Sequence, residues 1–592
     1  MLMSNPKSFY ETQLTYHNKQ TELLKKKLNT FSVFRLITFL LLLISTYFAF
    51  LGNNIALAFC VLGLFMFFTL LILHNQSKEK YKLQLRLKDI NSEELNILSG
   101  KYDHRNDGDA YKDSKHVFSL DIDLFGKGSF FQYMNRTTLL QGEKFLTYHL
   151  LSNNIKDVTM RQQAVQELSK HTVWRQRFSA IAQGFDVENS TKPMIKWLKD
   201  YTPFLNKIHY YSSIVFGLVS LLLFIGVFFG FFHFKYALYF LFIGLAVTGG
   251  FLKRINSLAL YTTKIKDIFM QYSLLLKEIE RLEVKSQLLQ EKKMQIQANQ
   301  KKSSVIFNEF YKALDALDHR NNLLVALFGN GYFLRDIIKS YRVEQWIKNY
   351  GEKIEDWFET VNFFDAYNSL ATFTFNHPDL CFPEITSNQT TISAQDLGHP
   401  LITHQKRVTS DFKISRDSFF IITGANMAGK STFLRTVALH IVMANCGLPV
   451  TAKKSQYHPV KLITSMRTTD SLDQESSYFF SELSRLKFIV EHIENDKTYF
   501  IILDEILKGT NSKDKAKGSR QFVEKLIKLK ATGIIATHDL SLTTIENEID
   551  EIENYYFDVQ IINDELLFDY KLKKGVCKNM NASFLLKKMK IV

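Results

Sequence analysis

The chain has 592 residues, of which 46% are hydrophobic, and it carries a formal net charge of +15. This length and apolar content are enough for several domains together with membrane helices. The four cysteines, at positions 60, 381, 446 and 577, are scattered and form no C-x-x-C pair, so neither a zinc site nor a disulfide framework is indicated. The positive charge favours two classes of anionic partner, nucleic acid and anionic lipid.

Two pairs of long apolar runs predict membrane helices. A helix needs about 20 apolar residues to cross the hydrocarbon core of a bilayer. The turns within each pair are too small to be domains, so each pair is interpreted as a helical hairpin. Buried core helices are the alternative, and the first run is short enough for a shallow re-entrant hairpin. The runs cover residues 36–51 and 55–73, split at 52–54, and residues 213–232 and 236–252, split at 233–235.

Lysine and arginine residues set the predicted orientation, because cytoplasmic flanks carry the excess of positive charge. Basic residues stand on both outer flanks of both hairpins, whereas the turns within the pairs carry only Lys235. Both termini are therefore expected in the cytoplasm, in a multi-pass membrane protein with about four membrane helices. The polar stretch 1–35 is expected to be a cytoplasmic helix and not a cleavable signal peptide. The basic flanks contain Lys25, Lys26, Lys27, Arg35, Lys78, Lys80, Lys82, Arg86, Lys207, Lys253 and Arg254.

After the second hairpin, apolar residues recur at the a and d spacing of a heptad, with Ser286 as the one polar break. The pattern predicts a helix of about 45 residues, near 65 Å long at 1.5 Å per residue. It fits an ordinary amphipathic helix in a bundle, or a lever that carries motion to the membrane. The pattern positions are Ile265, Ile268, Tyr272, Leu275, Ile279, Leu282, Leu289 and Ile296.

Residues 424–431 fit G-x-x-x-x-G-K-[ST], the loop that cradles nucleotide phosphates. An apolar strand at 419–423 precedes the loop and a helical pattern at 432–444 follows it, as phosphate binding at a helix N-terminus requires. Lys430 is predicted to reach the β- and γ-phosphates, and the Ser431 hydroxyl to ligate Mg²⁺. The predicted ATP-binding residues of this loop are Gly424, Ala425, Asn426, Met427, Ala428, Gly429, Lys430, Ser431 and Thr432.

Two further apolar strands end in residues that suit nucleotide hydrolysis: Asp504-Glu505 ends one, and His538 follows the other. Ligands bind at the carboxyl ends of parallel strands. We expect Asp504 to hold Mg²⁺, Glu505 to polarise the attacking water and His538 to contact the γ-phosphate. Alone, the acidic pair fits a helix cap and His538 fits a polar loop. Beside the phosphate loop, Glu505, His538 and Lys430 form a predicted catalytic set for ATP hydrolysis.

Residues 424–450 (GANMAGKSTFLRTVALHIVMANCGLPV), with 503–512 and 536–539, resemble the nucleotide site of the MutS family of mismatch-repair ATPases. Two residues depart from the family pattern, because Ala425 replaces the usual proline and Ala428 replaces the usual glycine. The residue that contacts adenine is not assigned. Further matching segments are 398–401, 470–472, 477–483 and 570–575.

The resemblance implies a homodimer in which Ser477 of one subunit approaches the γ-phosphate held by the other, so Ser477 is predicted to bind ATP in trans. A weaker resemblance implies the family's helical core at 124–142 and 161–165, rejoined by the levers at 364–371. It also implies a variant that lacks the N-terminal mismatch-recognition domain, because only about a hundred residues precede the core. Residues 8–11 are similar to the family's aromatic-x-Glu wedge, but no domain surrounds them, and we interpret this likeness as coincidence.

The predicted fold is multidomain, with α-helical membrane hairpins, an α-helical core with lever helices, and a C-terminal α/β P-loop (ABC-like) ATPase domain on the cytoplasmic side. We predict a membrane-anchored dimer in which binding and hydrolysis of ATP with Mg²⁺ move the levers. The family leaves contact with mismatched or structured DNA open. The alternative is a membrane ATPase that acts on a protein partner or a transport substrate without DNA. The predicted segments are 1–35 (N-terminal helix), 36–73 (first hairpin), 74–116 (linker), 117–209 (core, first part), 210–252 (second hairpin), 253–375 (levers and return to the core), 376–397 (linker) and 398–592 (ATPase domain).

Overall fold

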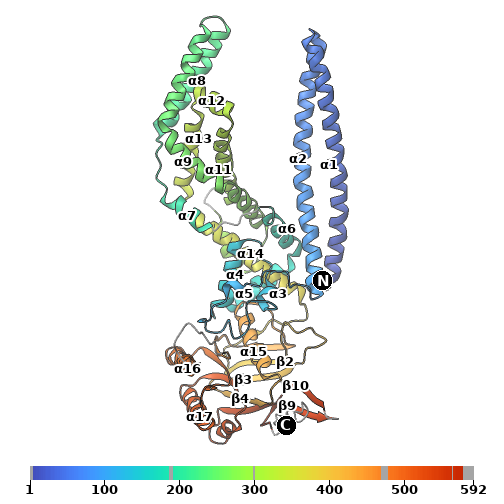
Figure 1. Cartoon of the computed structure of the whole chain (residues 1–592), viewed down its shortest axis with the longest axis vertical. Coiled ribbons are helices and arrows are strands. Elements are labelled where there is room, and N and C mark those ends of the chain that lie inside the picture. Colours follow the sequence, from blue (N-terminus) through green and yellow to red (C-terminus); the bar gives the residue numbers. More distant parts are fainter. Residues whose placement is uncertain (1–4, 186–190, 298–300, 468–477, 563–564, 578–592) are drawn as a thin grey trace.

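The computed structural model describes residues 5–185, 191–297, 301–467, 478–562 and 565–577. Two long helical arms rise from a helical core, and a C-terminal α/β region lies at the opposite end of the molecule (Figure 1). The first described residues lie where the first arm meets the core, and the last described residues lie in the α/β region.

The first arm is an antiparallel hairpin of α1 (Pro6–Phe50) and α2 (Asn54–Leu98). Gly52 makes the turn at φ +88°, and the Asn53 side chain caps α2 by accepting hydrogen bonds from its first backbone N–H groups. Each helix continues from an apolar outer half into a polar inner half. The linker expected at 74–116 is therefore helical as far as Leu98, because that stretch contains no glycine or proline before Gly100.

The second arm contains the other apolar hairpin, formed by α8 (Lys207–Phe228) and α9 (Phe234–Arg281). The long helix predicted after the hairpin is continuous with the second membrane run. Both form α9, which begins at Phe234, just before the apolar run 236–252, and ends at Arg281. The prediction of helix through Leu282 and Ser286 was wrong. The Glu167 carboxylate accepts the backbone N–H groups of Lys285 (2.6 Å) and Ser286 (2.7 Å), and these bonds hold the chain outside a helix. The arm is completed by α11 (Ser303–Asp318), η2 (His319–Asn321), α12 (Leu323–Phe333) and α13 (Arg335–Tyr350).

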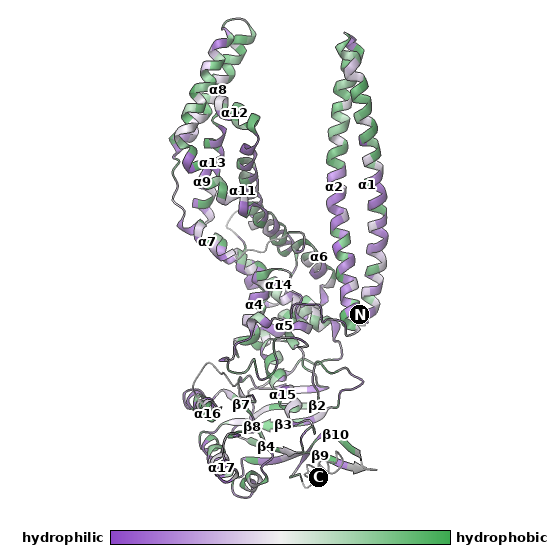
Figure 2. Ribbon diagram, viewed as in Figure 1, coloured by the Kyte–Doolittle hydropathy of each residue, from purple (hydrophilic) through white to green (hydrophobic). Residues whose placement is uncertain are grey.

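The outer ends of both arms are apolar and lie at the same end of the molecule (Figure 2). Within the described part of the chain, α1, α2, α8 and α9 are each long and apolar enough to cross a bilayer, by length and composition alone. The inner halves of α1 and α2, nearer the core, are polar. In the second arm, α8 is apolar along most of its length, and α9 becomes more polar beyond residue 252.

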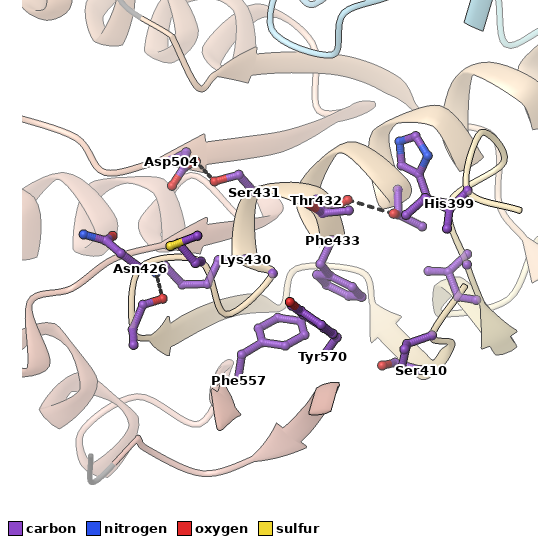
Figure 3. Close-up of a pocket in the computed structure, with 18 of the residues that line it drawn as sticks. His399, Ser410, Asn426, Lys430, Ser431, Thr432, Phe433, Asp504, Phe557 and Tyr570 are labelled. Carbon is purple, nitrogen blue, oxygen red and sulfur yellow. Dashed lines mark hydrogen bonds between the residues drawn. The ribbon is translucent and has the colours of Figure 1, made fainter. Parts of the chain in front are cut away.

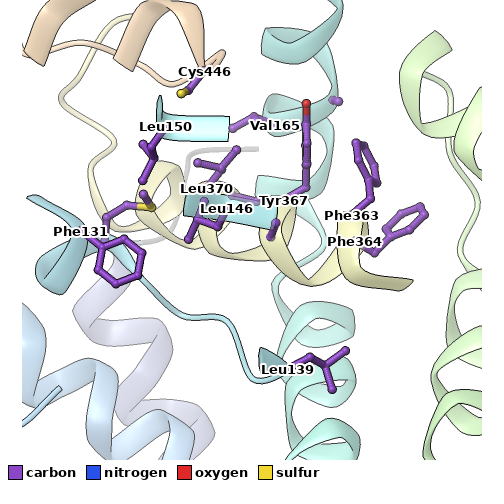
Figure 4. Packing of buried hydrophobic residues seen from close by; sticks show 14 of the residues in the cluster. Phe131, Leu139, Leu146, Leu150, Val165, Phe363, Phe364, Tyr367, Leu370 and Cys446 are labelled. Atoms are coloured by element: carbon purple, nitrogen blue, oxygen red, sulfur yellow. The ribbon is translucent and has the colours of Figure 1, made fainter. Parts of the chain in front are cut away.

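The core packs short helices around α14 (Ile354–Asn376), which is buried along most of its length. Apolar residues from the elements around it gather against Tyr367 and Leu370 (Figure 4). The Asp365 carboxylate accepts hydrogen bonds from the backbone N–H of Thr138 and that of Leu139, which joins two segments predicted to belong to the core. The other core elements are η1 (Asp109–Tyr111), α3 (Phe130–Met134), α4 (Leu140–Leu151), α5 (Val158–Lys170), α6 (Thr172–Ala182), α7 (Thr191–Asp200) and α10 (Gln287–Gln295).

The first arm is fastened to the core by buried polar groups. Tyr10 is 1% exposed, and its hydroxyl donates to Asn376 Oδ1 at 2.7 Å. Asn376 in turn donates to Glu94, which pairs with Arg136 at 2.6 Å. In the wedge-like stretch the aromatic residue is Phe9, which is half-buried at this junction, with its ring centroid 5.3 Å from that of Phe375.

The C-terminal region contains a six-stranded sheet of order β10-β9-β4-β8-β7-β6 and a four-stranded sheet of order β1-β5-β2-β3. Within the larger sheet, β4, β6, β7, β8 and β9 run parallel, and β10 is antiparallel. The linker expected at 376–397 contains two strands, because residues 390–397 pair with β3 and β5. The strands are β1 (Glu384–Ile385), β2 (Thr390–Leu397), β3 (Ser410–Ser415), β4 (Phe419–Gly424), β5 (Lys454–Tyr457), β6 (Lys461–Ser465), β7 (Tyr499–Asp504), β8 (Thr532–Ala536), β9 (Ile552–Ile562) and β10 (Glu565–Lys574).

Alternation along the strands builds two cores, since successive side chains of a strand point to opposite faces. In β4, Phe420 and Ile422 join the large core on the side of α15 (Lys430–Asn445), whereas Phe419 and Ile421 join a second core on the other face. That second core is covered by α16 (Tyr478–Asn495), α17 (Ser512–Lys528) and η3 (Leu540–Asn547). The central strands are thus buried on both faces, and only their ends remain open for function.

The helix that follows the phosphate loop reaches into the helical core at its far end. Arg161 donates to the carbonyl of Asn445, the last residue of α15, and Cys446 Sγ contacts the His149 carbonyl oxygen at 3.5 Å. Gly447 has φ +79°, and a Cβ there would lie 2.6 Å from the Cβ of Arg161. The phosphate loop and the helical core are therefore connected through one rigid helix.

Candidate functional site

The phosphate loop lies between β4 and α15, as its sequence predicts. Gly424 has φ +148° and Gly429 has φ +104°, conformations that favour glycine. Ala428, which stands where the related family has glycine, is not among the residues with positive φ and is buried, so the alanine is accommodated without strain. The positive φ falls instead on the neighbouring Met427, at +67°. The N-terminus of α15 begins at Lys430 and directs its free N–H groups toward the loop.

The Lys430 ammonium is almost buried and is held by the loop itself. It donates to the carbonyl oxygens of Gly424 (2.8 Å) and Ala425 (3.0 Å), and it lies 3.2 Å from His538 Nε2. Burial lowers the pKa of Lys430, and the nearby carboxylates of Asp504 and Glu505 oppose that effect. The Lys430 ammonium is therefore positioned to bind an anion that enters the loop.

Ser431 and Asp504 are also in contact, since the Ser431 hydroxyl donates to Asp504 Oδ2 at 2.7 Å. Burial raises the pKa of Asp504, while the hydrogen bond from Ser431 acts in the opposite direction. The hydroxyl and the carboxylate are close enough to bind one cation together. Mg²⁺ takes oxygen ligands of these kinds, together with water and phosphate oxygens. The two residues predicted to bind the metal therefore fit Mg²⁺.

Glu505 and His538 are in hydrogen-bond contact, with 2.8 Å between Oε1 and Nε2. The hydrogen bond from His538 lowers the pKa of Glu505 to about 2, so the carboxylate is ionised at neutral pH. Lys508 lies 3.6 Å away on the other side. Glu505 has φ +50°, an uncommon conformation for a residue with a side chain, and such strain concentrates at functional sites.

These side chains line one pocket of about 540 Å³, at the carboxyl ends of β4, β7 and β8 (Figure 3). Within the predicted phosphate loop, Asn426, Met427 and Thr432 line the same pocket. Gly424 and Ala428 belong to the predicted loop but do not line the pocket. Ser477 lies outside the described residues, as do residues 470–472. The residues in contact with the pocket also include Ala425, Gly429, Lys430, Ser431, Asp504, Glu505 and His538.

The other half of the pocket is aromatic and was not assigned from the sequence. His399, Phe433, Phe557 and Tyr570 line it, and a Cβ on Gly429 would lie 3.1 Å from the Tyr570 ring. Flat, apolar walls of this kind suit a nucleotide base. These residues come from segments about 170 positions apart. His399, Phe433 and Tyr570 each belong to a segment that resembles the family, whereas Phe557 lies in none of these segments. Their convergence could not be read from spacing.

Comparison with known proteins agrees with this geometry. Residues 420–589 match the family model described as MutS domain V. The chain is 33% identical over 234 residues to MutS protein homolog 4 of Homo sapiens, covering 38% of this chain and 24% of that protein. It is 31% identical over 243 residues to the DNA mismatch repair protein MutS of Persephonella marina, and 28% identical over 242 residues to that of Staphylococcus haemolyticus, covering in each case 40% of this chain and 27% of the relative.

The chain thus spans about a quarter of the length of the curated relatives it matches. The matched part contains the phosphate loop, the acidic strand end and His538, which lie together around one pocket. Residues 420–589 of this chain are therefore similar to the MutS family in its domain V.

Proposed function

We propose that this protein is an ATPase of the MutS type, anchored in a membrane by its two arms. The observation that carries the proposal is the convergence of Lys430, Ser431, Asp504, Glu505 and His538 on one pocket, from three strand ends. Each of these side chains has the chemistry that phosphoryl transfer to water needs, and their order along the chain is the one that the sequence motifs predict.

Each residue has a separate role in this proposal. Lys430 and the N–H groups at the start of α15 bind the phosphates of ATP. Ser431 and Asp504 would hold Mg²⁺, which supplies charge neutralisation to the phosphates when it is bound. Glu505 orients the attacking water and accepts its proton, and His538 contacts the γ-phosphate. The aromatic half of the pocket, with Phe557 and Tyr570, receives the base.

The apolar outer halves of the arms support membrane anchoring. Both arms present them at the end of the molecule opposite the nucleotide pocket, and the basic residues of the sequence flank the same segments. With this orientation the pocket faces the cytoplasm, where ATP is present, and both termini lie on that side. Dimerisation through the nucleotide sites, with Ser477 completing the partner's site, would let ATP binding reposition the arms.

DNA binding is a second candidate function, favoured by the names of the bacterial relatives, which are DNA mismatch repair proteins. The family match covers the nucleotide domain, so DNA contact is proposed only for the intact dimer. Binding of duplex DNA by the purified protein would have to weaken steeply with salt, because phosphate contacts release counterions. No binding at low salt would leave the alternative of a membrane ATPase that acts on a protein or transport substrate.

The nucleotide proposal is tested by the binding of a fluorescent ATP analogue to the detergent-solubilised full-length protein. Lys430→Ala is expected to lose at least tenfold in affinity, since the ammonium contacts the phosphates directly. Lys454→Ala on β5 removes an exposed lysine in the same domain and is the control. Unchanged affinity in Lys430→Ala would contradict the role of the loop.

A further inference from the structure

Helix α12 is uncharged, and much of its surface is exposed. Its eleven residues read LLVALFGNGYF. Leu323 is 79% exposed, Leu324 64% and Phe328 49%. Water-soluble surfaces rarely carry such a contiguous apolar patch, and patches of this kind mark contact with a membrane or another partner. The sequence alone did not single out this helix, because it is too short to read as a membrane span.

The opposite face of α12 packs on the second apolar hairpin. The Gly331 carbonyl lies directly against Gly244 of α9, where a Cβ would collide with it. The rings of Tyr332 and Phe224 of α8 are 4.7 Å apart, centroid to centroid. Gly244 and Phe224 both lie inside the apolar runs of the hairpin, at 236–252 and 213–232. Helix α12 therefore lies at the same depth as these runs.

Helix α12 is too short to cross a bilayer, since eleven residues at 1.5 Å each give about 16 Å against a hydrocarbon core of about 30 Å. The chain instead returns as α13. Polar side chains lie at both ends of α12, where the chain turns. The Asn322 side chain caps the first turn. Asn330 accepts the Asp336 backbone N–H at 2.9 Å, and the buried Asp336 carboxylate pairs with Arg320 at 3.2 Å.

Cations line a pocket of about 590 Å³ between α11 and α13, the helices that lead to and from α12. Lys312, Lys339 and Arg342 line it, and none of the three forms a salt bridge within the described ranges. The one carboxylate at this pocket, Glu309, pairs with Lys301 at 2.8 Å. Burial lowers the pKa of Lys339, and the positive charges of Arg342 and Arg335 lower it further. A cluster of like charges without counterions favours an anionic ligand.

We propose that α12 enters the bilayer beside the second hairpin as a re-entrant helix, and that Lys312, Lys339 and Arg342 bind the phosphate groups of anionic phospholipids at its edge. The proposal rests on the membrane anchoring proposed above. It commits to lipid because the exposed apolar face of α12 is continuous with the apolar hairpin, and because the cations stand on the helices that flank it. An apolar face bordered by unpaired cations matches the acyl chains and headgroup of one anionic lipid.

Membrane insertion of α12 is tested with the full-length protein in phosphatidylcholine vesicles that contain a phospholipid with a diazirine near the end of its acyl chain. After illumination, mass spectrometry locates the lipid adducts. We expect adducts on the apolar runs of α8 and α9 and on α12, and none on the peptide around the exposed Leu567 of β10. Adducts on α8 and α9 without α12 would overturn this inference and leave the anchoring intact. Absence of adducts from all three would contradict the anchoring itself.

The headgroup site is tested by replacing Lys312, Lys339 and Arg342 together with glutamine. Native mass spectrometry then measures retention of phosphatidylglycerol and of phosphatidylcholine. The control removes three exposed lysines from α17, Lys513, Lys517 and Lys528. We expect at least tenfold lower retention of phosphatidylglycerol in the first variant and wild-type retention in the control. Equal retention in both variants would overturn the proposal, as would loss of duplex DNA binding in the first variant without loss of the lipid.

Discussion

Nε2 of His538 lies 2.8 Å from the Glu505 carboxylate and 3.2 Å from the Lys430 ammonium. One ring nitrogen carries either a proton or a lone pair, so it can donate to Glu505 or accept from Lys430 but cannot do both at once. The strongly lowered pKa of Glu505 favours donation to the carboxylate. His538 is thus held by Glu505, with the Lys430 ammonium beside it, and the phosphates of ATP would enter next to this pair.

Glu505→Gln is expected to keep ATP binding and to lower turnover by about 100-fold or more, because the amide cannot accept a proton from water. Phosphate release under saturating ATP measures the loss, and a fluorescent ATP analogue measures binding. Glu491→Gln on α16, outside the pocket, serves as the control. Turnover near the wild-type rate in Glu505→Gln would end the assignment of this residue as the base.

The dimer model predicts complementation between two inactive variants. Lys430→Ala disables the subunit that binds ATP, and Ser477→Ala disables the contribution of its partner. A mixture of the two proteins should recover some ATPase activity, since a fraction of mixed dimers contains one site with both residues intact. Absence of rescue at every mixing ratio would count against a site shared between subunits.

The buried Asp365 gives the core a predicted pH dependence. Burial raises its pKa to about 7, against its hydrogen bonds from Leu139 and Thr138. An unfolded aspartate titrates at about 3.9, so from that pH up to about 7 the folded protein holds a proton that the unfolded chain has lost. The free energy of unfolding therefore falls as the pH rises through this range and levels off above it.

Asp365→Asn removes this titration. We expect the wild-type protein to be more stable than the variant at pH 5, and the difference to shrink by at most about 1.4 kcal/mol per pH unit up to pH 7. Thermal unfolding of both proteins in the same detergent at several pH values measures the difference. A difference in stability between the two proteins that stays constant from pH 5 to pH 8 would show that Asp365 does not titrate in this range.

Gly447 and Gly100 offer a matched pair of substitutions at the junction. Both have a left-handed conformation, with φ +79° and +85°, but a Cβ at Gly447 would collide with Arg161 whereas nothing lies within 4 Å of one at Gly100. Gly100→Ala should cost about 1 kcal/mol of stability from backbone strain alone. Gly447→Ala should cost at least twice as much and should also lower ATPase activity, because it separates α15 from the core. Equal losses of stability in the two variants would mean that the close contact between Gly447 and Arg161 is unimportant.

The sequence predicted best those features that depend on residues close together in the chain. The phosphate loop, the acidic strand end and His538 stand at the ends of buried strands. The apolar run 213–232 is helical as far as Phe228 in α8, and the run 236–252 lies in the first part of α9. Periodicity misplaced helix ends instead. The heptad pattern continues across Leu282–Ser286, but the distant Glu167 holds that backbone outside a helix. Similarly, the sequence of residues 390–397 indicates a linker. In the structure they form a strand, because β3 and β5 pair with their backbone groups.

The aromatic half of the pocket shows why other features stayed hidden. His399 and Tyr570 are far apart in the sequence, and each alone is an ordinary residue of a loop or strand. The position of Tyr570 near the phosphate loop depends on the sheet order, which places β9 beside β4 and β10 beside β9. The re-entrant character of α12 likewise depends on its contact with Gly244 of α9, which no local pattern indicates.

The most direct test of the account is ATP hydrolysis by the full-length protein in lipid nanodiscs, measured as phosphate release with Mg²⁺ and with Mg²⁺ chelated. We predict turnover that requires Mg²⁺ and that Lys430→Ala abolishes, while Lys454→Ala retains it. Turnover that is absent from the wild-type protein, or that persists unchanged in Lys430→Ala, would contradict the assignment of this pocket as an ATPase site.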